Sequence, residues 1–173
     1  MTPAREKRIK EVLTRRQKGL VVVLEDIHDP HNAAAIMRTC DAFGVGEVWL
    51  VFDKEKSYNP KRVGKSSSSS ANKWLTFRKF KGAGECLDEL RKEKYFIVAT
   101  GLRGKTKDIF SAELSKRKIA LIVGNEHRGV SEAFLEEADS VVTIPMRGFV
   151  ESLNVSVATA LFIYEITRAR GAH

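Results

Sequence analysis

Apolar residues along this chain fall into short continuous runs and into longer runs with helical spacing. Residues 21–24 are β-branched or leucine, which is typical of a strand buried on both faces. Further strands are predicted at 48–52, 95–99, 119–123 and 141–144. Helical spacing is clearest at 33–43, with Asn32 as the expected N-cap and Gly44 as the stop, and further helices are predicted at 85–92, after Ser131 through Glu137, and at 153–168.

This alternation predicts an α/β fold. Strands separated by crossover-length segments favour a largely parallel sheet with helices on both faces. At 173 residues and 43% apolar content, residues 1–173 are expected to form one domain, with residues 1–19 as a basic N-terminal helical extension. The serine run at 65–71, which starts with Lys65, interrupts the rhythm. It is either a flexible linker or a stretch of small residues that allows close approach of a ligand or partner.

Composition excludes several classes of protein. No apolar run approaches the length of about 18 residues that a membrane span needs, and no charged-then-apolar leader opens the chain, so we expect a cytoplasmic protein without a membrane partner. Two cysteines are too few for a disulfide scaffold and lack zinc spacing. Cys40 lies within an apolar helical pattern, which favours the core over a nucleophilic role.

Basic residues are concentrated in two segments. The formal net charge is +8, and residues 1–20 carry seven Lys/Arg against two acids, while residues 53–81 carry nine against two. Such clustering is expected of a surface that binds nucleic acid phosphates. Lys73-Trp74 and residues 77–81 also interleave rings with cations, which suits contact with bases. The alternative is a solvated basic surface with its aromatic rings buried.

Three polar loops each follow a predicted strand and precede a predicted helix: residues 28–32, 124–129 and 145–154. Ligands of open α/β sheets bind at the carboxyl ends of strands, so these loops are predicted to form one site. Neither Gly44-Val45-Gly46 nor Gly82-Ala83-Gly84 has a third glycine at the spacing of a dinucleotide-binding motif. The chain contains neither a P-loop nor a GxSxG motif. A metal cluster of His28, His31, Glu126 and His127 is conceivable, but the histidines are equally suited to bonding loop backbone or RNA, and we expect no metal.

The three loops together resemble the motifs of the TrmH/SpoU branch of the SPOUT methyltransferases. The matching residues are Asn32 and Arg38 in N-x5-R spacing, Gly-Asn-Glu-His-Arg-Gly at 124–129, and Ile-Pro-Met-x-Gly-x-x-x-Ser-Leu-Asn at 144–154. The resemblance runs from about residue 5 to residue 168. Arg15-Arg16-Gln17 and the small-residue run before Trp74 are similar to the tRNA (guanosine-2′-O-)-methyltransferases of that branch. Many relatives have a longer basic C-terminal tail.

The resemblance implies a deep trefoil knot formed from about residue 95 to residue 168, which binds S-adenosylmethionine. The implied cofactor-binding residues are Thr100, Gly101, Leu102, Gly124, Asn125, Glu126, Ile144, Met146, Ser152 and Leu153. Glycine suits such loops because backbone groups then approach the adenine without a Cβ in the way. Val123, Ile144, Met146 and Leu153 would supply apolar walls.

The resemblance also implies the catalytic residues Arg38, Asn32, Glu126, Ser152 and Asn154. Arg38 would either activate the ribose hydroxyl or, because an arginine pKa above about 12 makes a poor base, orient the ribose and phosphate. Asn32 could cap its helix, position the substrate, or both. Glu126 could organise the cofactor loop, or its carboxylate could serve only to cap a loop. Ser152 and Asn154 could cap the last helix and also order the site.

The implied substrate is the guanosine at position 18 of the tRNA D-loop, methylated on its ribose 2′-oxygen. Ribosomal RNA is the alternative substrate, and a non-catalytic RNA-binding module is the alternative function. RNA-binding candidates are Arg8, Arg15, Arg16, Lys18, Lys61, Arg62 and Lys65, and DNA is not expected. The resemblance further implies a homodimer with Arg38 facing the partner's knot. The last helix is apolar over more than one face, which burial in the core would also explain.

Overall fold

In the computed structural model, which describes residues 2–63, 71–102 and 104–171, helices and strands alternate along the chain. The helices are α1 (Pro3–Thr14), α2 (Pro30–Ala42), α3 (Ala83–Lys92), α4 (Glu132–Glu137) and α5 (Val155–Ala169), with a 3-10 turn, η1, at Ala71–Lys73. The strands are β1 (Gln17–Glu25), β2 (Val45–Val51), β3 (Thr76–Phe80), β4 (Phe96–Thr100), β5 (Lys107–Asp108), β6 (Ile119–Val123) and β7 (Ser140–Thr143). No helix in these ranges is long and apolar enough to cross a lipid bilayer.

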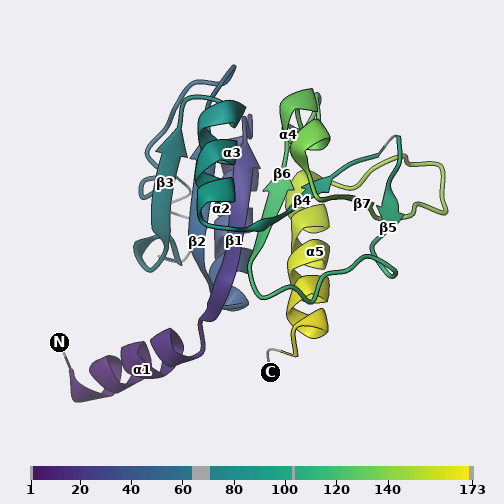
Figure 1. Cartoon of the computed structure of the whole chain (residues 1–173). Coiled ribbons are helices and arrows are strands. Elements are labelled where there is room, and N and C mark those ends of the chain that lie inside the picture. The colour runs from purple at the N-terminus through teal and green to yellow at the C-terminus, as the bar shows by residue number, and fades with distance from the viewer. Residues whose placement is uncertain (1, 64–70, 103, 172–173) are drawn as a thin grey trace.

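Seven described strands form one sheet in the order β3-β2-β1-β6-β4-β7-β5, and each pair of neighbours is parallel (Figure 1). The predicted parallel sheet is therefore confirmed. The chain adds β2 and β3 on one side of β1 and places all later strands on the other side. The direction of winding thus changes between β1 and β6, the place where open α/β sheets bind ligands at their carboxyl ends.

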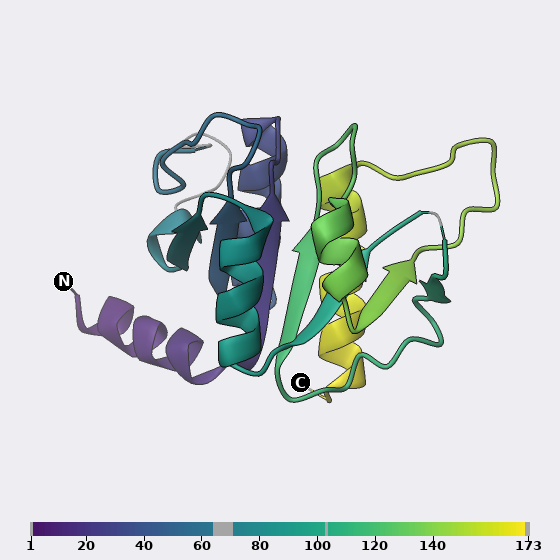
Figure 2. The same ribbon diagram turned by 45° about the horizontal axis from the view of Figure 1, so that its top comes forward.

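Helices cover both faces of the sheet, as predicted (Figure 2). On one face, Val22 and Leu24 of β1 pack in a cluster with Ile36 and Met37 of α2 and with Phe162 of α5. On the other face, Val21 and Val23 pack with Trp49 and with side chains of α3 and α4. Consecutive residues of β1 thus point into opposite hydrophobic layers, which explains the continuous apolar run in its sequence.

The predicted elements are present, with shifted ends. Residues 119–123 form β6 as predicted, whereas β1 begins at Gln17, inside the segment predicted as a helical extension. Helix α1 contributes no buried residue and lies apart from the sheet (Figure 1). Of the serine-rich segment at 65–71, residues 65–70 lie outside the described residues. Cys40 is fully buried, and this burial raises the pKa of its thiol, in agreement with the expected core role.

Strand β3 was not predicted, because the cation-ring alternation of residues 77–81 was interpreted as nucleic acid contact. Phe80 is buried and packs on Trp49 with ring centroids 5.1 Å apart. Arg78 lies over the same Trp49 ring at 4.7 Å and forms ion pairs with Glu89 and Glu93 of the α3 region. The alternative interpretation, with the rings turned towards the core, therefore holds for Phe80, and Arg78 braces the edge strand.

Candidate active site

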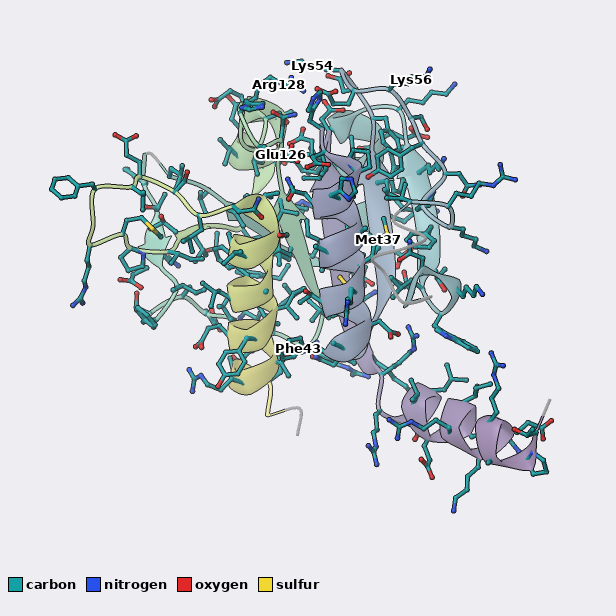
Figure 3. The ribbon with its side chains drawn as sticks, turned by 180° about the vertical axis from the view of Figure 1, so that it is seen from behind. Met37, Phe43, Lys54, Lys56, Glu126 and Arg128 are labelled. Atoms are coloured by element: carbon teal, nitrogen blue, oxygen red, sulfur yellow. The ribbon has the colours of Figure 1, made fainter. Side chains whose placement is uncertain are left out.

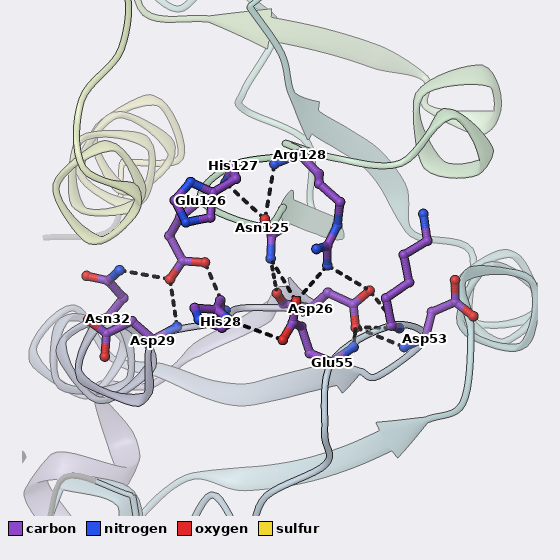
Figure 4. A network of polar contacts seen from close by, with 11 residues as sticks. Asp26, His28, Asp29, Asn32, Asp53, Glu55, Asn125, Glu126, His127 and Arg128 are labelled. Atoms are coloured by element: carbon purple, nitrogen blue, oxygen red, sulfur yellow. Dashed lines mark hydrogen bonds and ion pairs between the residues drawn. The ribbon is translucent and has the colours of Figure 1, made fainter.

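The carboxyl ends of the three adjacent strands β2, β1 and β6 meet in a network of polar contacts (Figure 4). Asp26, directly after β1, has a φ of 50° and is almost fully buried. Its carboxylate accepts hydrogen bonds from the backbone N–H groups of Asp53 (2.9 Å), Lys54 (3.0 Å) and Glu55 (3.1 Å), which follow β2. The three backbone donors satisfy the buried carboxylate of Asp26. Asp26 therefore fixes the start of the loop after β2.

Asn125 ties the loop after β6 to the same place. Its Nδ2 donates to the backbone oxygen of Asp26 at 2.8 Å. Its Oδ1 accepts the N–H groups of His127 (2.9 Å) and Arg128 (3.0 Å), so one buried side chain both shapes the 124–129 loop and anchors it to β1.

Glu126 of this loop binds the start of α2. Its carboxylate accepts the backbone N–H groups of His28 (2.8 Å) and Asp29 (3.1 Å) and the Nδ2 of Asn32 (2.8 Å). Partial burial opposes ionisation, but the hydrogen bonds from these donors outweigh it and hold the pKa of Glu126 below its ordinary value. Glu126 therefore acts as an ionised clamp between the β1 and β6 loops.

Asn32 extends this clamp to the segment before α5. The Nδ2 of Asn154 donates to the Oδ1 of Asn32 at 3.1 Å. Asn154 is also the N-cap of α5, because its Oδ1 accepts the N–H of Ser156 at 2.8 Å. The predicted capping role of Asn154 is confirmed, and Glu126, Asn32 and Asn154 form a continuous chain of hydrogen bonds.

The prediction that Asn32 caps its helix is wrong. Helix α2 begins at Pro30, and its N-cap is Asp29, whose carboxylate accepts the N–H of His31 at 2.8 Å. The Asp-Pro pair carried this signal, since proline suits the first helical position and aspartate the cap. Asn32 consequently lies inside the first turn, which leaves its amide to bind Glu126 and Asn154.

A cavity of about 1180 Å³ lies beside this chain of hydrogen bonds. It is lined by all ten residues that the family resemblance implied for the cofactor, namely Thr100, Gly101, Leu102, Gly124, Asn125, Glu126, Ile144, Met146, Ser152 and Leu153. These residues come from the last position of β4 and from the loops after β4, β6 and β7. Figure 2 shows the loop after β7 extending outward before it returns to α5.

One expectation about the cavity needs correction, and the glycines have a second role besides the expected one. Val123 is buried in the core and does not line the cavity, whereas Val141 and Val155 do. The glycines serve internal packing: a Cβ on Gly124 would lie 2.2 Å from the backbone of Gly129, and one on Gly101 would lie 2.6 Å from the side chain of Val141. Gly124 is thus required by the shape of its own loop, whatever the cavity binds.

Arg38 lies on the exposed side of α2 and is not among the cavity-lining residues. The buried residues of this helix, among them Ile36, Met37 and Cys40, lie on its other side. Of the five predicted catalytic residues, the structure therefore joins Asn32, Glu126 and Asn154 by hydrogen bonds and places Ser152 at the cavity, but it does not bring Arg38 into the cavity of the same chain.

The RNA-binding candidates differ in their surroundings. Arg8, Arg15, Lys18, Lys61 and Arg62 are exposed. By contrast, the Arg16 side chain is only 14% exposed and forms an ion pair with Asp41 at 3.4 Å, so it braces the junction between α1 and α2 instead of facing solvent. Lys65 lies outside the described residues.

The conceivable metal cluster is not seen in the part of the chain that the structure describes, where no group of three or more His, Cys, Asp or Glu side chains is arranged to hold a metal ion. His28 instead contacts Glu55. Asp26, Glu55 and Arg128 were missed as site residues, although Asp26 directly follows a buried strand and was open to the same reasoning as the three loops.

Comparisons with known proteins agree with this geometry. Residues 19–164 match the SpoU rRNA Methylase family. A tRNA (guanosine(18)-2'-O)-methyltransferase of Thermus thermophilus is 41% identical over 98% of this chain and 84% of its own.

Two solved structures are similar to this one. A TrmH/SpoU tRNA modifying enzyme of A. aeolicus has a TM-score of 0.88 and 36% identity over 97% of this chain and 83% of its own. The SpoU methyltransferase AviRb from Streptomyces viridochromogenes, in complex with the cofactor AdoMet, has a TM-score of 0.78 and 29% identity over 90% of this chain and 59% of its own. With the family match covering most of its length, the chain belongs to the SpoU methylase family.

Proposed function

We propose that the protein is an S-adenosylmethionine-dependent RNA 2′-O-ribose methyltransferase that acts on the guanosine at position 18 of tRNA. The observation that carries this proposal is the hydrogen-bonded chain Glu126–Asn32–Asn154 at the edge of a cavity lined by three loops. The Thermus thermophilus relative is named for this reaction, and the A. aeolicus structure is titled a tRNA modifying enzyme.

The cavity suits S-adenosylmethionine. Leu102, Ile144, Met146 and Leu153 provide apolar surface, and the loops after β4 and β6 provide backbone polar groups beside it, which is the usual character of a cofactor site. The similar AviRb structure is a complex with the same compound. When bound, S-adenosylmethionine supplies a methyl group that is already electrophilic. The protein then has to position the ribose 2′-hydroxyl and allow its proton to be removed.

In this proposal the residues of the chain have distinct roles. Glu126 stays ionised and holds Asn32, whose side chain in turn positions Asn154 at the start of α5. Ser152 lines the cavity two residues earlier, where its hydroxyl would order the same loop. Arg38 would contact the ribose and its phosphate as an orienting cation, because the high pKa of a guanidinium disfavours its use as a base.

Arg38 is proposed to serve the active site of a partner subunit. The supporting observation is an exposed apolar stripe on α5, where Val157, Leu161 and Tyr164 remain 49%, 43% and 56% exposed. These residues recur at helical spacing, so they share one face. Figure 3 shows α5 beside α2, the helix that carries Arg38, on the same side of the sheet. Such a stripe is typical of a subunit interface, and pairing through it would bring Arg38 near the partner's cavity.

We further propose that the segment from about residue 95 to residue 168 forms a trefoil knot. The chain belongs to the SpoU methylase family, and the knot is what its resemblance to the SPOUT methyltransferases implies. A knotted segment would hold the three cavity loops against each other without a ligand, which favours a preformed binding site.

The test is methyl transfer to defined RNAs. The protein is incubated with S-adenosylmethionine carrying a labelled methyl group and an unmodified tRNA, and the RNA is digested to locate the label. We expect 2′-O-methylguanosine at position 18, and no label on a matched tRNA with 2′-deoxyguanosine at that position. Label only on a ribosomal RNA fragment would identify the alternative substrate, while tight tRNA binding without transfer would identify a non-catalytic module.

A further inference from the structure

The segment that follows β2 presents two lysines next to the active-site network. The backbone N–H groups of Asp53, Lys54 and Glu55 all bond the buried carboxylate of Asp26. This anchoring fixes the path of the segment. The Glu55 side chain turns towards the network, whereas Lys54 and Lys56 are exposed. Figure 3 shows Lys54, Lys56 and Arg128 at the same end of the molecule as Glu126.

Glu55 connects this segment to both neighbouring loops. One carboxylate oxygen accepts a hydrogen bond from the Arg128 guanidinium at 2.9 Å, and the other lies 3.0 Å from Nδ1 of His28. Arg128 belongs to the 124–129 loop, and the backbone N–H of His28 is bound by Glu126. The path from Glu55 to Glu126 therefore crosses a single residue, His28 (Figure 4).

The exposed charges of the segment after β2 are mostly positive. Within the described residues, neither Lys54 nor Lys56 forms an ion pair, and Glu55 is already neutralised by Arg128 and His28. Asp53 is the remaining exposed acid of the segment, and Lys61 and Arg62 follow further along it. Exposed lysines held on an anchored backbone bind phosphates with less loss of conformational freedom than lysines on a mobile loop.

We propose that Lys54 and Lys56 bind phosphates of the RNA substrate and that Glu55 is a positioning residue that fixes them relative to the Glu126 clamp. The inference rests on the proposed function and deepens it. RNA is the expected partner because the lysines lie at the same carboxyl edge of the sheet where a ribose has to reach the cavity. An RNA strand held there would be coupled to the active site through Glu55, His28 and Glu126.

The lysines are tested by direct binding. Affinity of the Lys54→Gln/Lys56→Gln variant for tRNA is measured by fluorescence anisotropy over a range of salt concentrations. We expect weaker binding, with the slope of log K against log salt reduced by about 1 per lysine, and unchanged affinity for S-adenosylmethionine. The control is Lys92→Gln/Lys116→Gln, which removes the same charge at the opposite, amino-terminal edge of the sheet. Each of these lysines is ion-paired with a nearby glutamate, Glu89 or Glu113, and we expect the wild-type slope.

A slope for Lys54→Gln/Lys56→Gln equal to that of the wild type would overturn the phosphate contact while leaving the proposed methyl transfer intact. Absence of any tRNA binding or methyl transfer by the wild-type protein would instead overturn the proposed function. The two failures are therefore distinguishable. Both lysines are on the surface, so the variants are expected to fold, and a thermal unfolding curve verifies this.

Glu55 is tested with Glu55→Gln, which keeps the shape of the side chain and removes its charge. A negative charge is lost near RNA, so tRNA affinity should stay equal or increase. If Glu55 positions the lysines and the loop, methyl transfer to bound RNA should nevertheless slow by about tenfold. Transfer at the wild-type rate would overturn the positioning role. A double-mutant cycle combines Glu55→Gln with Arg128→Gln. The loss of methyl-transfer rate in the double variant, expressed as free energy, should be smaller than the sum of the two single losses, because both substitutions break the same pair.

Discussion

Asn32 and Asn154, which are 122 residues apart in sequence, are joined by a hydrogen bond from Nδ2 of Asn154 to Oδ1 of Asn32 at 3.1 Å. The same Asn154 side chain caps α5 through its oxygen. The oxygen of this amide thus caps the helix, and its nitrogen binds Asn32 in the site. These two roles can be separated by substitution.

Asn154→Ala should remove both roles, destabilising the fold by about 1 kcal/mol through loss of the cap and abolishing methyl transfer. Asn154→Ser retains a capping oxygen but is too short to reach Asn32. We therefore expect the serine variant to unfold close to the wild-type temperature and still to lose activity. Calorimetry together with the methyl-transfer assay provides both readouts, and a serine variant of full activity would show that the Asn32 contact is dispensable.

Gly124→Ala should be strongly destabilising. The added Cβ would lie 2.2 Å from the backbone of Gly129, which cannot move without breaking the 124–129 loop. We expect a loss of about 3 kcal/mol in the free energy of unfolding, measured by chemical denaturation. The control is Gly148→Ala, whose Cβ would have no neighbour within 4 Å and which should change stability by less than about 0.5 kcal/mol. If the two variants had equal free energies of unfolding, the close approach of Gly124 to the backbone of Gly129 would be refuted.

The contact between His28 and Glu55 predicts a pH window. The hydrogen bond to Glu55 raises the pKa of His28, and the hydrogen bonds from His28 and then Arg128 lower the pKa of Glu55. A raised histidine pKa stabilises the fold fully below the ordinary value of 6.5, and this contribution is lost as pH rises through the raised value. The lowered pKa of Glu55 stabilises the fold above its ordinary value of 4.5, and this contribution is lost as pH falls.

His28→Gln should therefore lower Tm most between these two limits, near about pH 5.5, and have little effect by about pH 9. Because the His28 side chain is 62% exposed to solvent, the difference should also shrink at high salt. Thermal unfolding of wild type and variant across this range measures it. A Tm difference that does not vary with pH would show that the pair has no electrostatic role.

Mixing two inactive variants tests whether Arg38 acts across a dimer. Arg38→Ala subunits and Asn154→Ala subunits, each inactive as homodimers, should recover activity in heterodimers, since one of the two sites then combines an intact Arg38 with an intact Asn154. Cofactor affinity of Arg38→Ala should stay within a few-fold of wild type because Arg38 does not line the cavity. Heterodimers without activity would mean either that both residues act in the same subunit's site or that RNA binding needs two intact sites. Sedimentation showing an active monomer would exclude the shared site.

The sequence pattern predicted most of the buried strands, and the family resemblance predicted the cavity residues, but neither predicted the contacts between them. The apolar run at 119–123 predicted a strand, and it forms β6 with these bounds. Nothing in the sequence places β6 next to β1, however, and this neighbourhood is what brings Glu126 to Asn32. Strand β3 was missed because its alternating cations and rings have the same composition as an RNA-binding surface. Glu55 was missed because a single acid between lysines has no distinctive pattern.

The place of β1 in the sheet has a consequence for how the protein folds. One edge of β1 pairs with β2, which follows it closely in the chain, but its other edge pairs with β6, where Leu20 lies opposite Ile119. During synthesis, this second edge stays unpaired while the intervening residues are made, and an apolar unpaired edge favours aggregation. We therefore expect slow folding limited by closure of this distant pair, and truncated chains ending before Ile119 should be the forms most prone to aggregate.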